Sequence, residues 1–460
     1  MRLVGWLLNL VYVGLLTAAS PLVLWRMLRH GRYRIGWRER LFGWLPPSPD
    51  DGRETLWLHA VSVGEVLLLR PLVARLRSQH PGLRIVITTA TDSGFAVARE
   101  QYQDCVVTWM PLDFTWAVRT ALRRLRPTVC GLVELELWPN LLMAARSAEV
   151  PIVLVNGRLS ERSWRGYRRL RPLVSRLLSG IARIGVQNAT YAARFLDLGA
   201  EKSAVVVTGS LKFDGCHTDR ENIATMAVRE SLSISDGERV FVAGSTGPGE
   251  EAIVLEAWER AKLLYPDLRL ILVPRHRERF EEVARLIESR GHRLRRRSET
   301  IVTPARRADG RTAGDGAAPP VLLVDTIGEL SAVWGVADFA FVGGSLFPGR
   351  GGQSMIEPAG YAAAVMFGPH TANFQAVVEQ FTAANAVRVV SDAAAMTRCL
   401  EGWLSARESA LELGSRAREL VLSQQGATER TLAALESVLA QRAGLSWTEA
   451  MGRPESSRAA

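Results

Sequence analysis

Cysteine, histidine and lysine are scarce in this chain of 460 residues. The four cysteines are scattered without a C-x-x-C pair, which excludes a disulfide framework and favours free thiols in a reducing compartment. The seven histidines have no metal-ligand spacing, so we expect no metal site held by the protein.

Arginine supplies nearly all of the positive charge. The net charge is +10, yet the chain has only three lysines, Lys202, Lys212 and Lys262. An arginine-rich surface suits anionic partners such as phosphates or acidic lipid. No basic stretch is interleaved with aromatic residues, so we expect no nucleic acid partner, although charge alone would allow a membrane-tethered nucleic-acid binder. The length and the 47% hydrophobic content suit a globular protein with two cores.

The N-terminus carries a long apolar run, from Leu3 to Trp25. A bilayer-spanning helix needs about 20 residues, so this run predicts a membrane anchor over residues 1–30. By the positive-inside rule, the arginine cluster that follows keeps the rest of the chain in the cytoplasm. Those arginines are Arg26, Arg29, Arg32, Arg34, Arg38 and Arg40. A cleaved signal peptide, with Thr17–Ser20 as its cleavage region, and a helix lying in the interface are competing interpretations.

Beyond residue 50, short apolar runs alternate with amphipathic stretches, which is typical of a parallel sheet with crossover helices. The first set of predicted strands is Thr55–His59, Arg84–Thr89, Val106–Met110, Thr128–Val133, Ile152–Val155, Arg183–Val186 and Val205–Thr208. The second set is Val240–Ala243, Leu268–Val273, Val321–Val324, Phe339–Val342, Ala364–Phe367 and Val387–Val390. The pattern predicts an α/β fold with two Rossmann-like domains, residues 31–215 and 216–440, and a tail over 441–460. Residues 303–320 are interpreted as a surface insertion.

A carboxylate follows the first predicted strand. Thr55–His59 leads through a tight turn into a helix predicted over Glu65–Leu76. Ligands of open α/β sheets bind at the carboxyl ends of the strands, and a helix N-terminus stabilises a carboxylate. Glu65 is therefore a candidate catalytic group, although a glutamate in a first turn is also a common helix start.

Two further motifs end strands of the first domain. Glu134 and Glu136 follow Thr128–Val133, and alternation predicts them on opposite faces, so only one would point into a crevice. A loop salt bridge is the simpler interpretation of that pair. Lys212 lies in Gly209–Asp214, at the predicted link between the domains.

The second domain repeats this arrangement. Gly244–Gly247 and Gly343–Ser345 are tight turns after strands, whose N–H groups we expect to bind an anion such as phosphate. Arg275 ends another strand, and Glu357 enters a helix after a glycine-rich turn, where a carboxylate can bind ribose hydroxyls. These features predict a nucleotide site, with a flexible glycine loop as the alternative.

Together the segments resemble one family. The phrases HAVSVGE, ELELWPN, NGRLSERS, GSLKFD, LVPRH, DTIGELS, FVGGS and IEPAG are similar to those of 3-deoxy-D-manno-octulosonic acid (Kdo) transferases, in the same order from the N-terminus to about residue 430. The resemblance implies a GT-B glycosyltransferase, with two Rossmann-like domains facing a cleft. It also implies CMP-Kdo as donor substrate, the lipid A precursor as acceptor, and action at the cytoplasmic face of the inner membrane without a cofactor.

The resemblance also implies roles for residues. Glu65 would be the catalytic base, with Glu134 and Lys212 as transition-state stabilisers. Nucleotide contacts would come from Pro274, Arg275, Ile327, Gly328, Glu329, Ser354, Met355, Ile356 and Glu357. An inverting transfer needs a base for the acceptor hydroxyl, and a lysine or arginine can stabilise the departing phosphate.

Two positions depart from the family pattern. Gly247 stands where the family usually has histidine, and Gln353 and Ser354 stand where it has His-Asn. Both departures concern the nucleotide side, so a transferase or epimerase using a UDP-sugar and a catalytically silent membrane protein remain alternatives.

Overall fold

The computed structural model describes residues 2–30, 35–302 and 319–442 and divides the chain into two compact units. The first unit combines residues 1–215 with the chain from Gln424 onward, and the second is Cys216–Ser423. This division differs from the expected domain end at residue 440, because the last helix packs with the first unit. Most of the expected insertion at 303–320, and nearly all of the tail at 441–460, lie outside the described residues.

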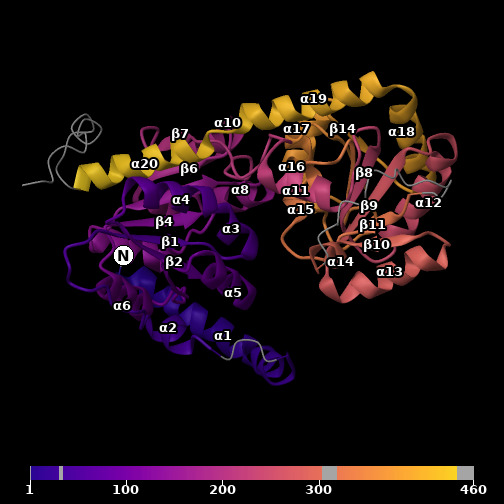
Figure 1. Ribbon diagram of the computed structural model, residues 1–460. Helices are drawn as coiled ribbons and strands as arrows, with labels where there is room; N and C mark the ends of the chain where they lie inside the picture. The colour runs from indigo at the N-terminus through magenta and orange to yellow at the C-terminus, as the bar shows by residue number, and fades with distance from the viewer. Residues whose placement is uncertain (1, 31–34, 303–318, 443–460) are drawn as a thin grey trace, which may run out of the picture. The chain divides into compact units, whose positions relative to one another are not determined.

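The described part of the first unit contains a seven-stranded parallel sheet in the order β3-β2-β1-β4-β5-β6-β7. Its strands are β1 (Thr55–His59), β2 (Arg84–Thr89), β3 (Val106–Trp109), β4 (Val129–Val133), β5 (Ile152–Gly157), β6 (Ile181–Val186) and β7 (Val205–Val207). Its helices are α1 (Arg2–His30), α2 (Trp37–Phe42), α3 (Val63–Leu68), α4 (Arg70–Gln79), α5 (Asp92–Gln101), α6 (Thr115–Leu125), α7 (Pro139–Ser147), α8 (Glu161–Arg168), α9 (Arg171–Leu178), α10 (Ala189–Asp197) and α20 (Ala427–Arg442). Helices cover both faces of this sheet, as Figure 1 shows.

The second unit repeats the architecture with the order β10-β11-β9-β8-β12-β13-β14. Its strands are β8 (Arg239–Thr246), β9 (Leu268–Pro274), β10 (Leu294–Arg296), β11 (Val321–Leu323), β12 (Phe339–Val342), β13 (Ala364–Phe367) and β14 (Val387–Val389). Its helices are α11 (Ile223–Ser231), α12 (Glu250–Leu264), η1 (Arg277–Arg279), α13 (Phe280–Ser289), α14 (Arg297–Val302), α15 (Leu330–Trp334), α16 (Ile356–Gly360), η2 (Ala372–Phe374), α17 (Gln375–Ala383), α18 (Ala393–Ser405) and α19 (Arg407–Gln424). The predicted α/β class with two Rossmann-like sheets is confirmed.

Two local features differ from the sequence prediction. The helix expected over Glu65–Leu76 is two helices, because Pro71 lacks the N–H group that a continuous helix would need and instead lies in the first turn of α4, which begins at Arg70. Ser62 caps α3, which therefore begins at Val63. The edge strand β10 was not predicted, since Leu294–Arg296 carries two arginines and no apolar run.

Helix α1 is apolar enough over Val4–Leu22 to cross a membrane, but one face of it packs on the first unit. Asn9 on that face is buried, and its amide donates to Thr115 Oγ1 at 2.7 Å and accepts the Thr115 N–H at 3.1 Å. The Tyr12 hydroxyl donates to Asp113 Oδ2 at 3.2 Å. The opposite face exposes Trp6, Leu7, Leu10 and Val11.

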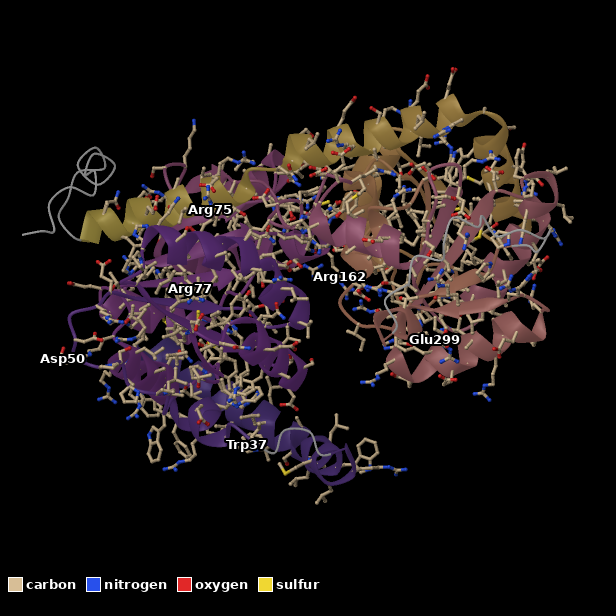
Figure 2. All side chains as sticks on the ribbon, viewed as in Figure 1. Trp37, Asp50, Arg75, Arg77, Arg162 and Glu299 are labelled. Carbon is tan, nitrogen blue, oxygen red and sulfur yellow. The ribbon has the colours of Figure 1, made fainter. Side chains whose placement is uncertain are left out.

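The C-terminal helix α20 packs against α4, β5 and β6 of the first unit, with Leu432 and Leu435 in the core. The Asp214 carboxylate accepts the N–H groups of Gly426, at 2.8 Å, and of Thr428. Arg75 on α4, labelled in Figure 2, pairs with Glu429 at 2.5 Å. The first unit is therefore completed by the last described helix of the chain.

Candidate active site

The first sheet changes direction between β1 and β4, which lie side by side while their helical connections run to opposite sides. Ligands of doubly wound sheets bind outside the carboxyl ends of the strands at such a point. Glu65 follows β1 and Glu134 follows β4 directly, so both candidate acids lie at this edge.

Glu65 is held by a capping box at the start of α3. Its N–H donates to Ser62 Oγ at 3.5 Å, while the Ser62 hydroxyl donates to Oε1 at 2.9 Å and the Val61 N–H to Oε2 at 2.7 Å. Burial raises the pKa of Glu65, these hydrogen bonds lower it, and the charge of Glu134 raises it further. A carboxylate offers about four lone-pair sites, so the two bonds leave capacity for a third proton donor.

Glu134 faces Lys212. Its Oε1 lies 3.8 Å from the Lys212 Nζ, and both side chains are partly exposed. Lys212 reaches this point because the loop after β7 turns back along the sheet edge, where the Leu211 N–H donates to the buried Asn156 Oδ1 at 3.1 Å. A loose, hydrated pair of this kind contributes little to stability, so both charges remain available to a ligand.

The prediction that alternation separates Glu134 from Glu136 is wrong. Glu134 has a left-handed backbone, φ 60°, so the chain leaves the strand at this residue and no longer alternates. Glu136 joins the same cluster: burial first, then the charges of Glu65 and Glu134, raise its pKa to about 7, while the Trp138 Nε1–H donates to its Oε2 at 2.8 Å. The sequence pattern placed Glu136 on the opposite face, because no spacing rule predicts the left-handed turn at Glu134.

The rings of His59, Trp138 and Tyr167 lie beside Glu136 or beside one another. His59 is fully buried at the end of β1, and burial lowers its pKa to about 4, so the ring is neutral. Its Nδ1 lies 3.1 Å from the carbonyl oxygen of Thr88, and the Trp138 ring stands edge-on to it with centroids 6.0 Å apart. Tyr167 on α8 contributes a hydroxyl whose pKa is raised by burial and by Glu136.

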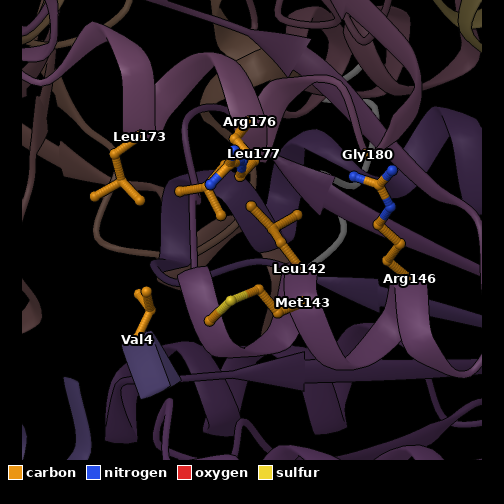
Figure 3. A pocket seen from close by; sticks show the side chains of 8 residues that line it. All are labelled: Val4, Leu142, Met143, Arg146, Leu173, Arg176, Leu177 and Gly180. Atoms are coloured by element: carbon orange, nitrogen blue, oxygen red, sulfur yellow. The ribbon is translucent and has the colours of Figure 1, made fainter. Parts of the chain in front are cut away.

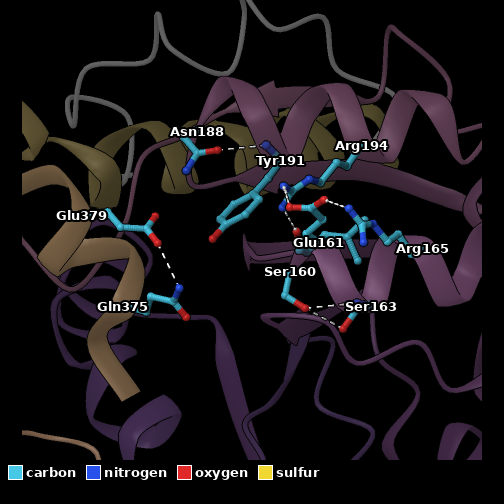
Figure 4. A network of polar contacts seen from close by, with 10 residues as sticks. Ser160, Glu161, Ser163, Arg165, Asn188, Tyr191, Arg194, Gln375 and Glu379 are labelled. Carbon is cyan, nitrogen blue, oxygen red and sulfur yellow. Dashed lines mark hydrogen bonds and ion pairs between the residues drawn. The ribbon is translucent and has the colours of Figure 1, made fainter. Parts of the chain in front are cut away.

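The NGRLSERS segment places α8 beside this cluster. Ser160 caps the helix by accepting the Ser163 N–H at 3.2 Å, and the Arg194 guanidinium donates to the Leu159 carbonyl at 2.7 Å. Figure 4 shows the Ser160–Ser163 cap, with Glu161 next to Arg165 and Arg194. This segment is therefore a rigid support for Tyr167.

In the second unit, the predicted anion site is already filled by the protein. The chain reverses between β8 and β12, and the buried carboxylate of Glu250 lies there. It accepts four N–H groups from the two turns, those of Gly247 at 2.7 Å, Gly344 at 2.7 Å, Ser345 at 2.9 Å and Leu346 at 2.9 Å. The expectation that these groups are free for a phosphate is therefore wrong, because α12 starts with a glutamate that reaches back to them.

The charge of Arg275 acts on Glu357. The Arg275 N–H donates to the Thr246 carbonyl at 3.0 Å, which places the residue at the end of β9 with its side chain exposed. Burial raises the pKa of Glu357, and the charges of His217 and Arg275 lower it. Pro274, next to Arg275, is buried.

The other predicted nucleotide contacts differ from one another in exposure and in hydrogen bonding. Ile327 is 74% exposed, and Gly328 is left-handed. Glu329 instead accepts from the Arg297 guanidinium at 2.8 Å, so it holds α14 to the loop after β11. Ser354 is partly exposed, whereas the Met355 and Ile356 side chains are buried, and only the backbone of those two could meet a ligand.

Arg350 occupies the space that a side chain at position 247 would fill. A β-carbon on Gly247 would come within 2.7 Å of Arg350 Nη1, so the guanidinium packs directly over this glycine. Sequence reasoning did not select Arg350, because the two residues are far apart in the chain. Within the described ranges, no three His, Cys, Asp or Glu side chains are grouped so that they could hold a metal ion, the three clustered glutamates included.

Comparison with known proteins places this chain in a family. A 3-deoxy-D-manno-octulosonic-acid transferase (kdotransferase) family profile matches residues 35–215. The 3-deoxy-D-manno-octulosonic acid transferase of Haemophilus influenzae is 32% identical over 434 residues, which cover 94% of this chain and 96% of that protein. The enzyme of the same name from Bordetella pertussis is 34% identical, with coverage of 93% and 99%.

Solved structures agree on the fold. A UDP-GlcNAc 2-epimerase from Neisseria meningitidis, 13% identical, aligns with a TM-score of 0.55 over 84% of this chain and 100% of its own. A glycosyltransferase from Rickettsia africae, also 13% identical, aligns with a TM-score of 0.53 over 86% of this chain and 100% of its own. At this identity the likeness shows the architecture alone. Because two relatives match this chain over nearly its full length, the chain belongs to the family of Kdo transferases, which are glycosyltransferases of the GT-B fold.

Proposed function

We propose that this glycosyltransferase moves Kdo from CMP-Kdo onto a hydroxyl of the lipid A precursor, with inversion and with Glu65 as general base. The observation that carries the proposal is the position of Glu65 at the switch point of the first sheet, beside Glu134 and Lys212. The relatives named as Kdo transferases support the transferred sugar.

The proposed step is one displacement. The acceptor oxygen forms a bond to the anomeric carbon while the bond from that carbon to the phosphate oxygen of CMP breaks, and Glu65 takes the hydroxyl proton. The raised pKa of Glu65 makes its carboxylate a stronger base than a hydrated one. Lys212, held by Glu134, would stabilise the charge that develops as the nucleotide departs.

The second unit would bind the donor. Because Glu250 occupies the N–H groups of both turns, side chains would bind the phosphate of CMP, and we propose Arg275 and Arg350 for this role. Glu357, whose pKa is lowered by the charge of Arg275, would accept hydrogen bonds from ribose hydroxyls. Donor phosphate would then be neutralised by guanidinium groups, without a resident cofactor.

The acceptor and the membrane would meet the first unit at α1. Arg146 and Arg176 flank a small apolar pocket beside Val4, as Figure 3 shows, so cationic groups lie next to the apolar helix. Guanidinium groups at that position suit the phosphates of an anionic glycolipid or of the leaflet itself. We propose that α1 anchors the enzyme to the inner membrane, with both units in the cytoplasm.

The test is mass spectrometry of a lipid A precursor incubated with the enzyme and freshly generated CMP-Kdo. We expect the mass of at least one added Kdo. Glu65→Gln should keep the fold and lose about 10²–10⁴-fold in transfer rate, because an amide cannot accept the proton. Glu100→Gln, an exposed glutamate on α5, is the matched control. Near-normal transfer by a folded Glu65→Gln protein would reject the assignment of the base.

The donor site has its own test. Arg275→Ala and Glu357→Ala should raise the KM for CMP-Kdo and leave the fold intact. Thermal stabilisation by CMP and by UDP is then compared, because a UDP-sugar enzyme would respond to UDP. Unchanged donor kinetics in both variants would remove these residues from the donor site.

A further inference from the structure

An apolar pocket of about 300 Å³ lies between α1, residues 112–114 after β3, and Trp138 of the ELELWPN segment. Its apolar lining is Leu15, Leu16 and Ala19 from α1, with Leu112, Phe114 and Trp138 from the first unit. The ring of Tyr12 and the carboxylate of Asp113 complete the wall. Apolar cavities of about 150 Å³ already bind benzene, so this volume suffices for a stretch of hydrocarbon.

The polar groups of the wall are already bound. Asp113 is buried, and its carboxylate accepts the Tyr12 hydroxyl at 3.2 Å and the N–H groups of Asn140 at 2.9 Å and Leu141 at 2.8 Å. No further polar ligand is needed to satisfy it. The pocket therefore favours an apolar occupant over a sugar or a phosphate.

The helix keeps the pocket at the membrane. Residues 5, 9, 12, 16 and 19 recur at helical spacing on the face of α1 that meets the first unit, over about 21 Å of helix. The other face exposes Trp6, Leu7 and Leu10, which need lipid to cover them. A chain entering the pocket would thus come from the lipid that covers α1.

The pocket is one side chain away from the carboxylates. Trp138 lines it and also donates its indole N–H to Glu136 at 2.8 Å, and the pKa of Glu136 responds to Glu65. Trp138 therefore links the wall of the pocket to the cluster that contains Glu65. Resting on the proposed function, we propose that this pocket binds an acyl chain of the acceptor and so positions its hydroxyl at the base.

The test separates the chain from the sugar. Ala19→Trp should fill the pocket, and Ala18→Trp is the matched control, because Ala18 is exposed like Ala19 but does not line the pocket. For Ala19→Trp we expect the KM for the acylated acceptor to rise about tenfold, as for roughly two methylene groups left in water. The KM for CMP-Kdo and the rate with a deacylated acceptor should stay unchanged. Equal effects on both acceptors, or no effect on either, would overturn the proposal.

A second measurement uses the unmodified enzyme. An acceptor with a photoreactive diazirine in one acyl chain should label the peptides that contain Leu16 and Trp138, and excess unlabelled acceptor should suppress the labelling. Labelling of the same peptides by a photoreactive phospholipid that acceptor fails to suppress would assign the pocket to bulk lipid and overturn the proposal. Absence of Kdo transfer by the wild type, with acceptor-specific labelling retained, would contradict the proposed function and leave the acyl site standing.

Discussion

Glu136 couples the candidate site to pH. Its pKa is raised from 4.5 to about 7, so between those values the folded protein holds a proton that the unfolded chain releases. The stability that this proton contributes is complete at low pH and is lost as pH rises to about 7. At pH 8 the folded state therefore carries the cost of a third charge beside Glu65 and Glu134.

We expect Glu136→Gln to stabilise the protein at pH 8 relative to the wild type and to have little effect at pH 5. The difference should be on the order of 1 kcal/mol, since the side chain is partly exposed and its shift is screened. Thermal unfolding of both proteins at the two pH values measures it. If the difference in unfolding free energy between the two proteins is the same at pH 5 and pH 8, the raised pKa of Glu136 is contradicted.

A second prediction for a single residue concerns donor binding by Arg350. If its guanidinium binds the phosphate of the donor from its position over Gly247, then Arg350→Ala should raise the KM for CMP-Kdo about 10–100-fold, the usual value of a hydrogen bond to a charged group. Arg407→Ala, an exposed arginine at the start of α19, is the control. Steady-state kinetics with varied CMP-Kdo concentration measure this KM. Equal KM values in the two variants would exclude Arg350 from donor binding.

Three glutamates show which residue positions could be predicted from the sequence. Glu65 was placed correctly at a strand end because a strand, a tight turn and a helix start leave a local pattern. The face of Glu136 was predicted wrongly, because it depends on the left-handed φ of Glu134. The role of Glu250 was not predicted, because it depends on backbone groups almost a hundred residues away. Neither relation has a signature in the spacing of residue types.

At the scale of elements, most strands follow from their apolar runs, and the helices beside them from amphipathic spacing. The interruption at Leu69 follows from Pro71 only once the capping box has fixed where α3 begins. The attachment of α1 could not be predicted, because one buried Asn9 in an apolar run reads equally well as a tolerated polar residue in a span.

We expect Asn9→Leu to loosen α1 from the first unit. The change removes the hydrogen bonds with Thr115 and leaves the Thr115 N–H without its acceptor, which should cost about 1–3 kcal/mol. Hydrogen exchange should rise at the start of α6 and in the ELELWPN segment, whose Asn140 also contacts Asn9 at 3.4 Å. Unchanged exchange in both segments would show that α1 is held by other contacts.

The docking of α20 makes a second prediction for an element. Leu435 is fully buried in the core of the first unit, so Leu435→Ala should destabilise that unit by about 2–5 kcal/mol. Leu411 on α19 is 57% exposed, and Leu411→Ala should be nearly neutral. Chemical denaturation is monitored by limited proteolysis, whose fragments distinguish the unfolding of the two units. Equal denaturation midpoints for the first unit in both variants would contradict the docking.

For the whole molecule, the exposed face of α1 and the arginines beside it predict attachment to anionic membranes. Trp6 is 68% exposed on that face, and Trp6→Glu should reduce retention on liposomes severalfold, more so at high salt. Asn9→Leu, on the inner face, should leave retention unchanged. Liposome flotation compares them, while a periplasmic signal from a C-terminal reporter would reject the cytoplasmic topology.

The discontinuous first unit sets an order for biosynthesis. The N-terminal residues leave the ribosome first, but α20 is translated only after the roughly 210 residues of the second unit. At about 5–20 residues per second, the partly built first unit waits some 10–40 s, with α1 already able to meet lipid and the surface of α4 still uncovered. The first unit thus begins to form before the second unit but is completed after it. Premature termination before α20 would leave a membrane-bound chain whose first sheet is a substrate for chaperones and proteases.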